Sequence, residues 1–451
     1  MTKPQPIRDM LMRYAESGTA RFHMPGHKGH SVIFGAWDIT ELEESDNLQY
    51  PRGVIARSQD RWASAAGARV CRYLVNGATL GVQAMVLGCL PREGKLIAAR
   101  DAHRALSSAL AAFTVQPVWA ESEWDAERLL YRCNVPALLR KLEETPDADG
   151  VFITTPDYYG RIADTTALAA ACASRGIPLL ADCAHGGLAQ FLPRLPRLKA
   201  DVWVVSAHKT LSALTQTALM FSGEERPKLD AALRALQTSS PSYLMMASLE
   251  QALDIARNAD YGAYIIRMEA MRHSISEMKG LFCAAEESAL QSGYAACDPG
   301  RLCVDVTGRG LSGYRAAEIL RETGVRAEMA DMRRVVFICT PWDEAAWDDR
   351  LTKALSALPE EDFTVPRIAR PPEGLPSLQP WEVFSRKWEV LPLAEAEGRV
   401  LAEPLTVYPP GTALCVPGER MTREVAAYCR MAIALGGEAA GNGETISVIE
   451  E

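Results

Sequence analysis

The sequence predicts an α/β fold, in which a mostly parallel central sheet is followed by a smaller α+β unit. From about residue 69 to residue 223, apolar runs of strand length alternate with helical runs, which is the pattern of consecutive βαβ units. Several of these runs are apolar throughout, as strands covered by helices on both faces are. The expected strands are residues 69–75, 95–99, 150–154, 177–181, 202–206 and 217–221.

The helix after the third of these strands is delimited at both ends. Asp164 is a favourable N-cap residue, and Gly176 suits the left-handed conformation that often ends a helix. Beyond about residue 245 the pattern changes to long helical segments that continue to about residue 292. A smaller α+β domain is then predicted by two strands and the helix between them, at residues 302–307, 335–339 and 315–323.

Breaker residues divide the rest of the chain. Residues 366–376 are rich in Pro and Gly and predict a linker, after which a short C-terminal unit follows. From Gly436 onward we expect a frayed tail. The predicted organisation is an N-terminal arm at 1–40, a large ligand-binding domain at 41–260, the small domain at 261–363, the linker at 364–382, and the C-terminal domain with its tail at 383–451.

Composition excludes several classes of protein. A formal net charge of −9 over 451 residues argues against a nucleic-acid partner, since such proteins usually present a basic face. There is no run of about 18 apolar residues and no apolar leader, so we expect no membrane association and a cytoplasmic location. The eleven cysteines form no C-x-x-C pair and no zinc-type spacing, so we expect reduced, mostly buried thiols and no metal site.

In an open α/β sheet, ligands bind at the carboxyl ends of the strands, so the residues just after each strand are the informative ones. The turn Asn76-Gly77-Ala78-Thr79 opens a helix, where backbone N–H groups can bind a phosphate, although an ordinary turn would look the same. His103 follows the next strand and could stack on a flat ring or transfer a proton. A solvent-exposed histidine at a helix start is the alternative.

Two further strand ends carry ionisable residues. Asp182 follows an apolar strand, where a carboxylate is costly unless it pairs with a cation, although it could instead cap a turn. Lys209, in Ser206-Ala207-His208-Lys209, follows another apolar strand. Partial desolvation would make this lysine a nucleophile, whereas an isolated lysine is more often solvated. The combination of these residues on successive strand ends favours a functional site.

These segments, in this order, resemble one known family. The chain resembles the ornithine/lysine/arginine decarboxylases, pyridoxal 5′-phosphate (PLP) enzymes with the aspartate-aminotransferase-like fold (fold type I), in the short form without an N-terminal receiver-like domain. The resemblance covers nearly the whole chain. Besides the strand ends, it rests on motifs at residues 22–29, 38–41, 51–55, 155–160, 238–243, 408–411 and 417–419.

The resemblance implies a role for each residue of the site. Lys209 would form a Schiff base with PLP, and Asp182 would hold the pyridine nitrogen. His103 would stack on one face of the ring and Ala184 would pack on the other, with His185 beside them. Lys209 or His208 would protonate the α carbon after CO₂ leaves. The phosphate would be held by residues of the turn and of the lysine strand, namely Gly77, Ala78, Thr79, Ser206 and His208.

The resemblance also implies a homodimer, or a higher oligomer, with the active site at the subunit interface. A hydroxyl of Thr238 or Ser239 would reach the phosphate from the partner subunit. For the distal cation of a basic substrate we expect a carboxylate, because guanidinium and carboxylate pair in a bidentate fork. Glu419 is the candidate and Asp157 a second one, although either could be a solvated loop acid.

The chain departs from the family at several of these positions. Cys183 replaces a glutamate, Leu188 replaces a histidine, Ala207 replaces a threonine, and Ala78 replaces a hydroxyl residue. The main hypothesis from the resemblance is decarboxylation of arginine, lysine or ornithine, in polyamine biosynthesis or acid resistance. A fold type I aminotransferase or lyase, and a PLP-binding paralogue without turnover, remain as alternatives.

Overall fold

The computed structural model describes residues 18–22, 46–408, 412–439 and 445–450. Most of the expected N-terminal arm, the motif at 38–41 and nearly all of the motif at 22–29 lie outside the described residues, as do residues 409–411. None of the helices among the described residues has the length and apolar character needed to cross a membrane.

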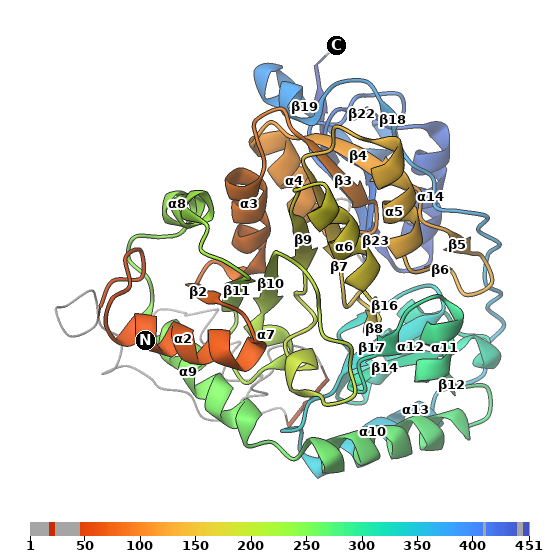
Figure 1. Ribbon diagram of the computed structural model, residues 1–451. Coiled ribbons are helices and arrows are strands. Elements are labelled where there is room, and N and C mark those ends of the chain that lie inside the picture. The colour runs from red at the N-terminus through yellow and green to blue at the C-terminus, as the bar shows by residue number, and fades with distance from the viewer. Residues whose placement is uncertain (1–17, 23–45, 409–411, 440–444, 451) are drawn as a thin grey trace, which may run out of the picture.

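A seven-stranded sheet forms the centre of the large domain (Figure 1). Its strand order is β2-β11-β10-β9-β7-β3-β4, and only β11 runs antiparallel to its neighbours. The mostly parallel sheet expected from the sequence is therefore confirmed. In sheet order the strands are Val70–Leu74, Ala218–Ser222, Val202–Ser206, Leu179–Asp182, Gly150–Thr154, Lys95–Ala99 and Gln116–Ala120.

Helices cover both faces of this sheet and create two hydrophobic cores. Alternate residues of one strand point into different cores: Val151 and Ile153 into one, Phe152 into the other. This is why the strand sequence is apolar throughout. The covering helices of the domain are α2 (Val54–Ala66), α3 (Gly77–Cys89), α4 (Arg104–Ala112), α5 (Val135–Glu144), α6 (Thr166–Ser174), α8 (Pro227–Leu236) and α9 (Tyr243–Arg257).

The six predicted strands of the large sheet lie within two residues of the observed ones, and one strand of that sheet was missed. The helical stretch expected to continue to about residue 292 is interrupted by a short strand at Phe282–Cys283. Helix α6 ends before Gly176, which has the left-handed φ of 67°, and Asp164 accepts a hydrogen bond from the N–H of Thr166. Strand β4 was not predicted. It contains Pro117, which removes a ladder donor, and it lies at the sheet edge, where a proline is tolerated.

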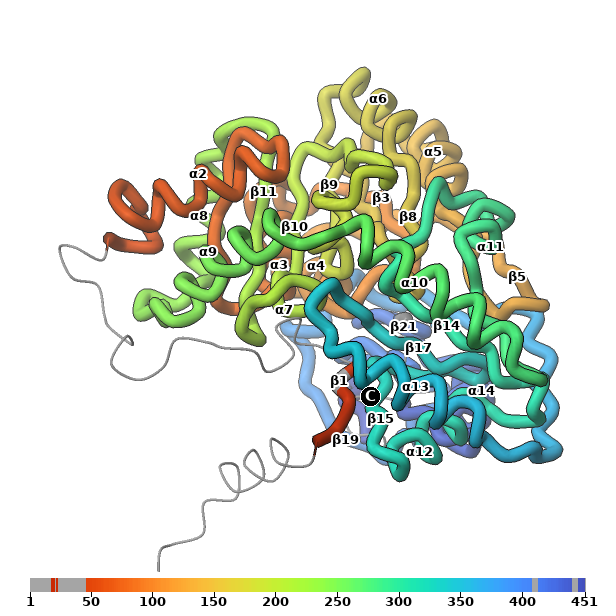
Figure 2. The backbone as a smooth tube through the Cα atoms, turned by 90° about the horizontal axis from the view of Figure 1, so that it is seen from below, coloured from red at the N-terminus to blue at the C-terminus, as the bar shows by residue number. Residues whose placement is uncertain are grey.

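The smaller α+β domain is also confirmed. Its four strands have the order β12-β14-β17-β16, with Arg301–Asp305 (β14) and Arg334–Ile338 (β17) at the centre and Phe282–Cys283 (β12) and Met329–Ala330 (β16) outside. Strand β1 (Ala20–Arg21) pairs with β15 (Val325–Arg326), which brings the beginning of the described chain beside this domain (Figure 2). The domain's main helices are α10 (Tyr261–Ser276), α12 (Gly313–Glu322) and α13 (Ala345–Ser356).

The C-terminal unit has a core of its own, and the expected frayed tail is wrong. Strand β24 (Thr445–Ile449) pairs over its whole length with β19 (Trp388–Pro392), and β23 (Glu438–Ala439) pairs with β20 (Leu405–Tyr408). Ile446 and Val448 are buried. The unit also contains β21 (Thr412–Cys415), α14 (Arg423–Ala434), and β22 (Glu419–Arg420), which pairs with β18 (Leu375–Pro376) from the segment predicted as a linker.

All eleven cysteines are free thiols, and most are buried, as the sequence predicts.

The pairing of β24 can be tested by exchanging Ile446 for Ala. Because Ile446 is buried against the C-terminal core, we expect I446A to lower the free energy of unfolding by about 2–5 kcal/mol in urea titrations. The control is S447A, whose side chain lies on the other face of the strand and should change the free energy by no more than about 0.5 kcal/mol. Equal, negligible effects of both exchanges would show that the tail is frayed.

Candidate active site

The carboxyl ends of the parallel strands meet at one edge of the large sheet. Strand β9 ends at Asp182 and β10 at Ser206, and β3 leads into the segment that carries His103. Strands β9 and β10 are neighbours, and the short helix α7 (Ala207–Thr210) follows β10 directly, so Asp182 and Lys209 face the same space. The sheet order therefore brings the predicted residues together.

Lys209 lies at the centre of this group and is partly buried. Its Nζ is 3.0 Å from Nε2 of His185. Burial lowers the pKa of Lys209, while the carboxylates of Glu328 and Asp182 act in the opposite direction and Arg301 reinforces the lowering. A lysine with a lowered pKa has a larger neutral fraction, which is the form that can attack a carbonyl carbon.

His185 connects Lys209 to Arg301 of the small domain. Nη2 of Arg301 is 3.2 Å from Nδ1 of His185. A guanidinium can only donate, so Nδ1 is an acceptor and the neutral ring carries its proton on Nε2, facing the lysine amine. Burial, followed by the charges of Lys209 and Arg301, holds the pKa of His185 well below its usual value. This chain of contacts favours a neutral lysine and a neutral imidazole.

Asp182 is a buried carboxylate with no ion-pair partner among the described residues. Its Oδ1 accepts a hydrogen bond of 2.9 Å from the N–H of Ala184. Burial raises the pKa of Asp182, and both this hydrogen bond and Lys209 oppose the shift. A carboxylate in this position lacks a cation, and a protonated ring nitrogen would supply one.

His103 is the N-cap residue of α4 and is mostly buried. Its Nδ1 accepts a hydrogen bond of 3.1 Å from the N–H of Ala105. Burial, with smaller effects from Lys209 and Arg104, lowers the pKa of His103 to about 4. At neutral pH the ring is uncharged, which suits stacking on a flat aromatic ligand. The solvent-exposed histidine considered as an alternative does not fit this placement.

The predicted phosphate turn is the N-terminus of α3. Gly77, the first residue of the helix, has a φ of 77°, a conformation that glycine adopts without strain. Thr238 lies beside this turn, because its N–H donates to Oδ1 of Asn76 in the same chain at 3.3 Å. Thr238 and Ser239 are exposed, so the structure leaves them accessible to a partner subunit.

His208 has a more restricted role than the sequence suggested. Its Nδ1 donates to the carbonyl of Thr217 at 2.9 Å, so the neutral ring has no proton on Nε2. Burial lowers the pKa of His208, which favours this neutral form. A hydrogen bond from His208 to a phosphate oxygen therefore requires the protonated ring.

These residues fit PLP, the cofactor that the sequence implies. Asp182 provides a buried carboxylate for the pyridine nitrogen, His103 a neutral ring for stacking, and Lys209 a desolvated amine for covalent attachment. The N-terminus of α3 and the buried Ser206 would take the phosphate. In addition, Oγ1 of Thr210 is buried without a hydrogen-bond partner among the described residues.

Two positions at which the chain departs from the pattern of the family it resembles are part of the apolar packing. Cys183 and Leu188 are buried in the core of the large domain. A Cβ atom on Gly187 would lie 2.5 Å from Oγ1 of Thr210, so this loop packs closely on α7 only because position 187 has no side chain. Polar residues of the family pattern are thus replaced by a tightly packed turn behind the lysine.

Glu419 does not offer a free carboxylate to a substrate. It is buried and forms a bidentate ion pair with Arg100, with distances of 2.9 Å (Nη1 to Oε2) and 2.5 Å (Nη2 to Oε1). Its Oε2 also accepts a hydrogen bond from the N–H of Val416. The pair joins the C-terminal unit to the segment after β3. This contact depends on the packing of two domains and has no signal in the local sequence.

Asp157 also forms an ion pair within the chain. Its Oδ2 is 2.7 Å from Nε and 2.6 Å from Nη2 of Arg161, and its Oδ1 accepts from the N–H groups of Tyr159 and Arg161. The carboxylate therefore shapes the loop between β7 and β8 (Arg161–Ile162). Neither acid predicted for the distal cation is unpaired in the described structure.

Sequence reasoning missed two residues that contact the site. Arg301 belongs to the small domain, and no pattern in its neighbourhood marks it. The ring of Tyr158 lies 4.9 Å from the ring of His185, and Nζ of Lys209 is 5.9 Å from the centre of the same tyrosine ring. Tyr158 belongs to the recognised motif at 155–160, which could have suggested a role for it.

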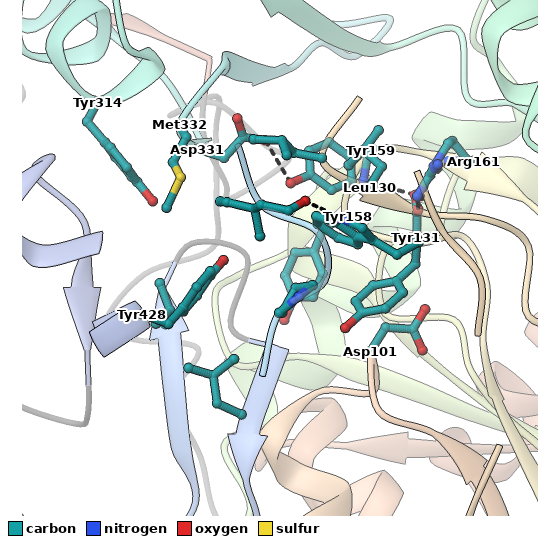
Figure 3. Close-up of a pocket in the computed structure, with 17 residues that line it drawn as sticks. Asp101, Leu130, Tyr131, Tyr158, Tyr159, Arg161, Tyr314, Asp331, Met332 and Tyr428 are labelled. Atoms are coloured by element: carbon teal, nitrogen blue, oxygen red, sulfur yellow. Dashed lines mark hydrogen bonds and ion pairs between the residues drawn. The ribbon is translucent and has the colours of Figure 1, made fainter. Parts of the chain in front are cut away.

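A cavity of about 100 Å³ begins behind Tyr158. Residues of all three domains line it (Figure 3). Asp101 and Tyr131 lie on one side, while Tyr314 of the small domain and Tyr428 of the C-terminal unit lie across from them.

The lowered pKa of His103 has a consequence for stability. The pKa is about 4 in the folded protein against a usual value of 6.5, so the stabilising effect of the neutral ring is complete above pH 6.5 and is lost as the pH falls towards 4. Between these limits, we expect wild-type protein freed of cofactor to lose up to about 3 kcal/mol more unfolding free energy than H103Q. H273Q, at an exposed site, is the control and should follow the wild type. Parallel curves for wild type and H103Q would contradict the assignment.

Comparison with known proteins shows which family the chain matches. The family model for the Orn/Lys/Arg decarboxylase major domain matches residues 5–268, and the model for the C-terminal domain matches residues 372–446. An arginine decarboxylase of Bacillus subtilis is 30% identical over 94% of this chain and 92% of its own length. An arginine decarboxylase of Halalkalibacterium halodurans is 29% identical over 94% of this chain and 92% of its own.

The fold is also similar to that of solved structures. The structure of a constitutive lysine decarboxylase of E. coli superposes with a TM-score of 0.76, covering 99% of this chain and 82% of the other, at 17% identity. A ureidoglycine-glyoxylate aminotransferase of Bacillus subtilis has a TM-score of 0.54 and covers 67% of this chain and 83% of its own, at 14% identity. The fold is thus the expected fold type I architecture, and the chain belongs to the Orn/Lys/Arg decarboxylase family of PLP-dependent enzymes.

Proposed function

We propose that this enzyme decarboxylates arginine to agmatine and CO₂, with PLP attached to Lys209. The observation that carries the proposal is the desolvated Lys209 amine, which faces the unpaired carboxylate of Asp182 and the neutral rings of His103 and His185. Arginine is favoured over lysine and ornithine because relatives that align over nearly the whole chain bear the name arginine decarboxylase.

The cofactor supplies an electron sink for the bond between the α carbon and the carboxylate. The protein maintains the conditions for this chemistry. Asp182, when ionised, keeps a proton on the pyridine nitrogen, because a buried carboxylate stabilises a nearby cation. His103 and Ala184 would hold the ring from its two faces, which fixes the orientation of the bond that must break.

A proton must also reach the α carbon after CO₂ departs. Lys209 is the proposed donor, and His185 is placed to orient its amine through Nε2, 3.0 Å from Nζ. Arg301 fixes this orientation by donating to Nδ1 of His185, which keeps the ring's proton on Nε2, on the side of the lysine. His208 is a second candidate donor, in its protonated form.

The proposal includes a homodimer, a cytoplasmic location and a role in polyamine synthesis. Exposed Thr238 and Ser239 lie beside the phosphate turn, which supports a homodimer in which each subunit completes the other's site. A cytoplasmic location and a role in polyamine synthesis would accord with the reduced cysteines and with the arginine decarboxylase relatives.

The reaction is tested by incubating the enzyme and PLP with arginine, lysine and ornithine and identifying the amines by mass spectrometry. We expect agmatine from arginine, without any added oxo acid. K209A should lower the rate by at least roughly 10³-fold, and D182N by roughly 10²-fold or more, because each removes a group that acts on the reacting atoms. Release of cadaverine or putrescine in place of agmatine would contradict the choice of arginine.

The same assay separates the alternatives. An aminotransferase would need an oxo acid and would release no CO₂. A protein that binds PLP, as its visible absorbance would show, and yet releases no amine from any of the three substrates would be a paralogue without turnover.

A further inference from the structure

We propose that Asp101 is the group that binds the distal cation of the substrate, in the cavity behind Tyr158. The inference rests on the proposed function, since it assigns the substrate subsite of the same active site. It replaces Glu419 and Asp157, the two acids that the sequence suggested, with a residue that the sequence analysis did not single out.

The first argument is position. Asp101 precedes His103 by two residues at the end of β3, so one strand end carries both the ring-stacking histidine and this carboxylate. Tyr158 forms the boundary between the two spaces: it lines the cavity, and its ring centre is 5.9 Å from Nζ of Lys209. A substrate held at Lys209 can therefore extend its side chain past Tyr158 towards Asp101.

The second argument is charge. The cavity is lined by three acids, and two of them are neutralised by arginines of this chain: Asp157 by Arg161, and Asp331 by Arg334 at 2.9 Å. Asp101 has no ion-pair partner among the described residues. Its two carboxylate oxygens accept hydrogen bonds from Nδ2 of Asn134, at 2.9 and 3.1 Å. A cation from outside would complete the pairing that the protein itself leaves open.

The third argument is the chemistry of the wall. Aromatic and aliphatic side chains dominate the lining, and Figure 3 shows the Tyr131 ring next to Asp101. A flat guanidinium is stabilised by aromatic faces and by a carboxylate at once. The volume of about 100 Å³ admits such a head group, because one water occupies about 30 Å³ in the liquid.

The groups around Asp101 predict how this subsite responds to pH. Burial raises the pKa of Asp101 to about 6; Asp157 acts in the same direction, whereas Arg161 and Asn134 oppose it. As the pH falls through this value, the carboxyl gains a proton and loses its attraction for a cation. The other ionisable groups that face it are Tyr131, Cys133 and Tyr294, and burial raises the pKa of each, so they stay neutral at this pH.

The test uses two ligands of nearly the same shape, the butylguanidinium ion and neutral butylurea, bound to the PLP-loaded enzyme in a titration calorimeter at pH 7.5. We expect the wild type to prefer the cation by roughly 10–100-fold, the usual size of a hydrogen-bonded ion contact. D101N, which keeps an oxygen for Asn134, should lose this preference. D164N removes the same charge at an exposed turn and should keep it.

Two further measurements make the outcome independent of a folding defect in D101N. In the wild type, the affinity for butylguanidinium should fall by up to about 10-fold per pH unit below pH 6, while that for butylurea stays level. In turnover, D101N should raise KM for arginine by roughly 10–100-fold and change kcat little. Full preference for the cation in D101N, or no preference and no pH response in the wild type, would overturn the assignment.

These outcomes separate the subsite from the reaction. If the wild type prefers the cation through Asp101 but releases no amine, the proposed function fails and the subsite stands. If the wild type releases agmatine and D101N has an unchanged KM, the function stands and the subsite fails.

Discussion

Exclusion of water from the carboxyl edge of the large sheet is the constraint on which the site depends. Lys209, His185 and His103 are all bases, and burial lowers the pKa of each of them. Arg301 adds a guanidinium, a group with a fixed positive charge, beside His185. The site therefore combines one fixed positive charge with three bases whose neutral forms are favoured by burial. Such a site suits a ligand that brings its own negative charge and needs a nucleophilic amine.

Close packing of small residues maintains this exclusion. A Cβ atom on Gly81 of α3 would lie 2.5 Å from Cγ2 of Val204, so the helix can approach β10 only without a side chain there. Gly187 plays the same part for the turn after Asp182. These contacts pack α3 closely against the sheet and the turn after β9 closely against α7. The catalytic geometry is thus held by the sheet and its nearest helices, with little freedom left to the loops.

Much of this arrangement could be predicted from the sequence, because it follows from local patterns. Apolar runs gave the strands, and the topology of parallel strands placed Asp182, His103 and Lys209 at one edge. The errors concern contacts between segments far apart. The strand that pairs the end of the chain with residues 388–392 has no local signal, and the buried pair of Arg100 with Glu419 joins residues from different domains. No periodicity within either segment specifies such a partner.

The Arg100–Glu419 pair also affects what the neighbouring cavity can bind. It fixes the C-terminal unit against the end of β3, and removing one member of a buried pair typically costs about 3–5 kcal/mol because the other charge is left unpaired. The cost of an unpaired buried charge also applies to Asp101, but here the missing partner is a ligand and not a residue of the chain. Its charge is unpaired until a cation enters, so a neutral ligand of the same shape would leave that penalty in place. Discrimination against amino acids with uncharged side chains then arises from the cost of a buried carboxylate without a partner, as well as from the attraction between Asp101 and a cationic side chain.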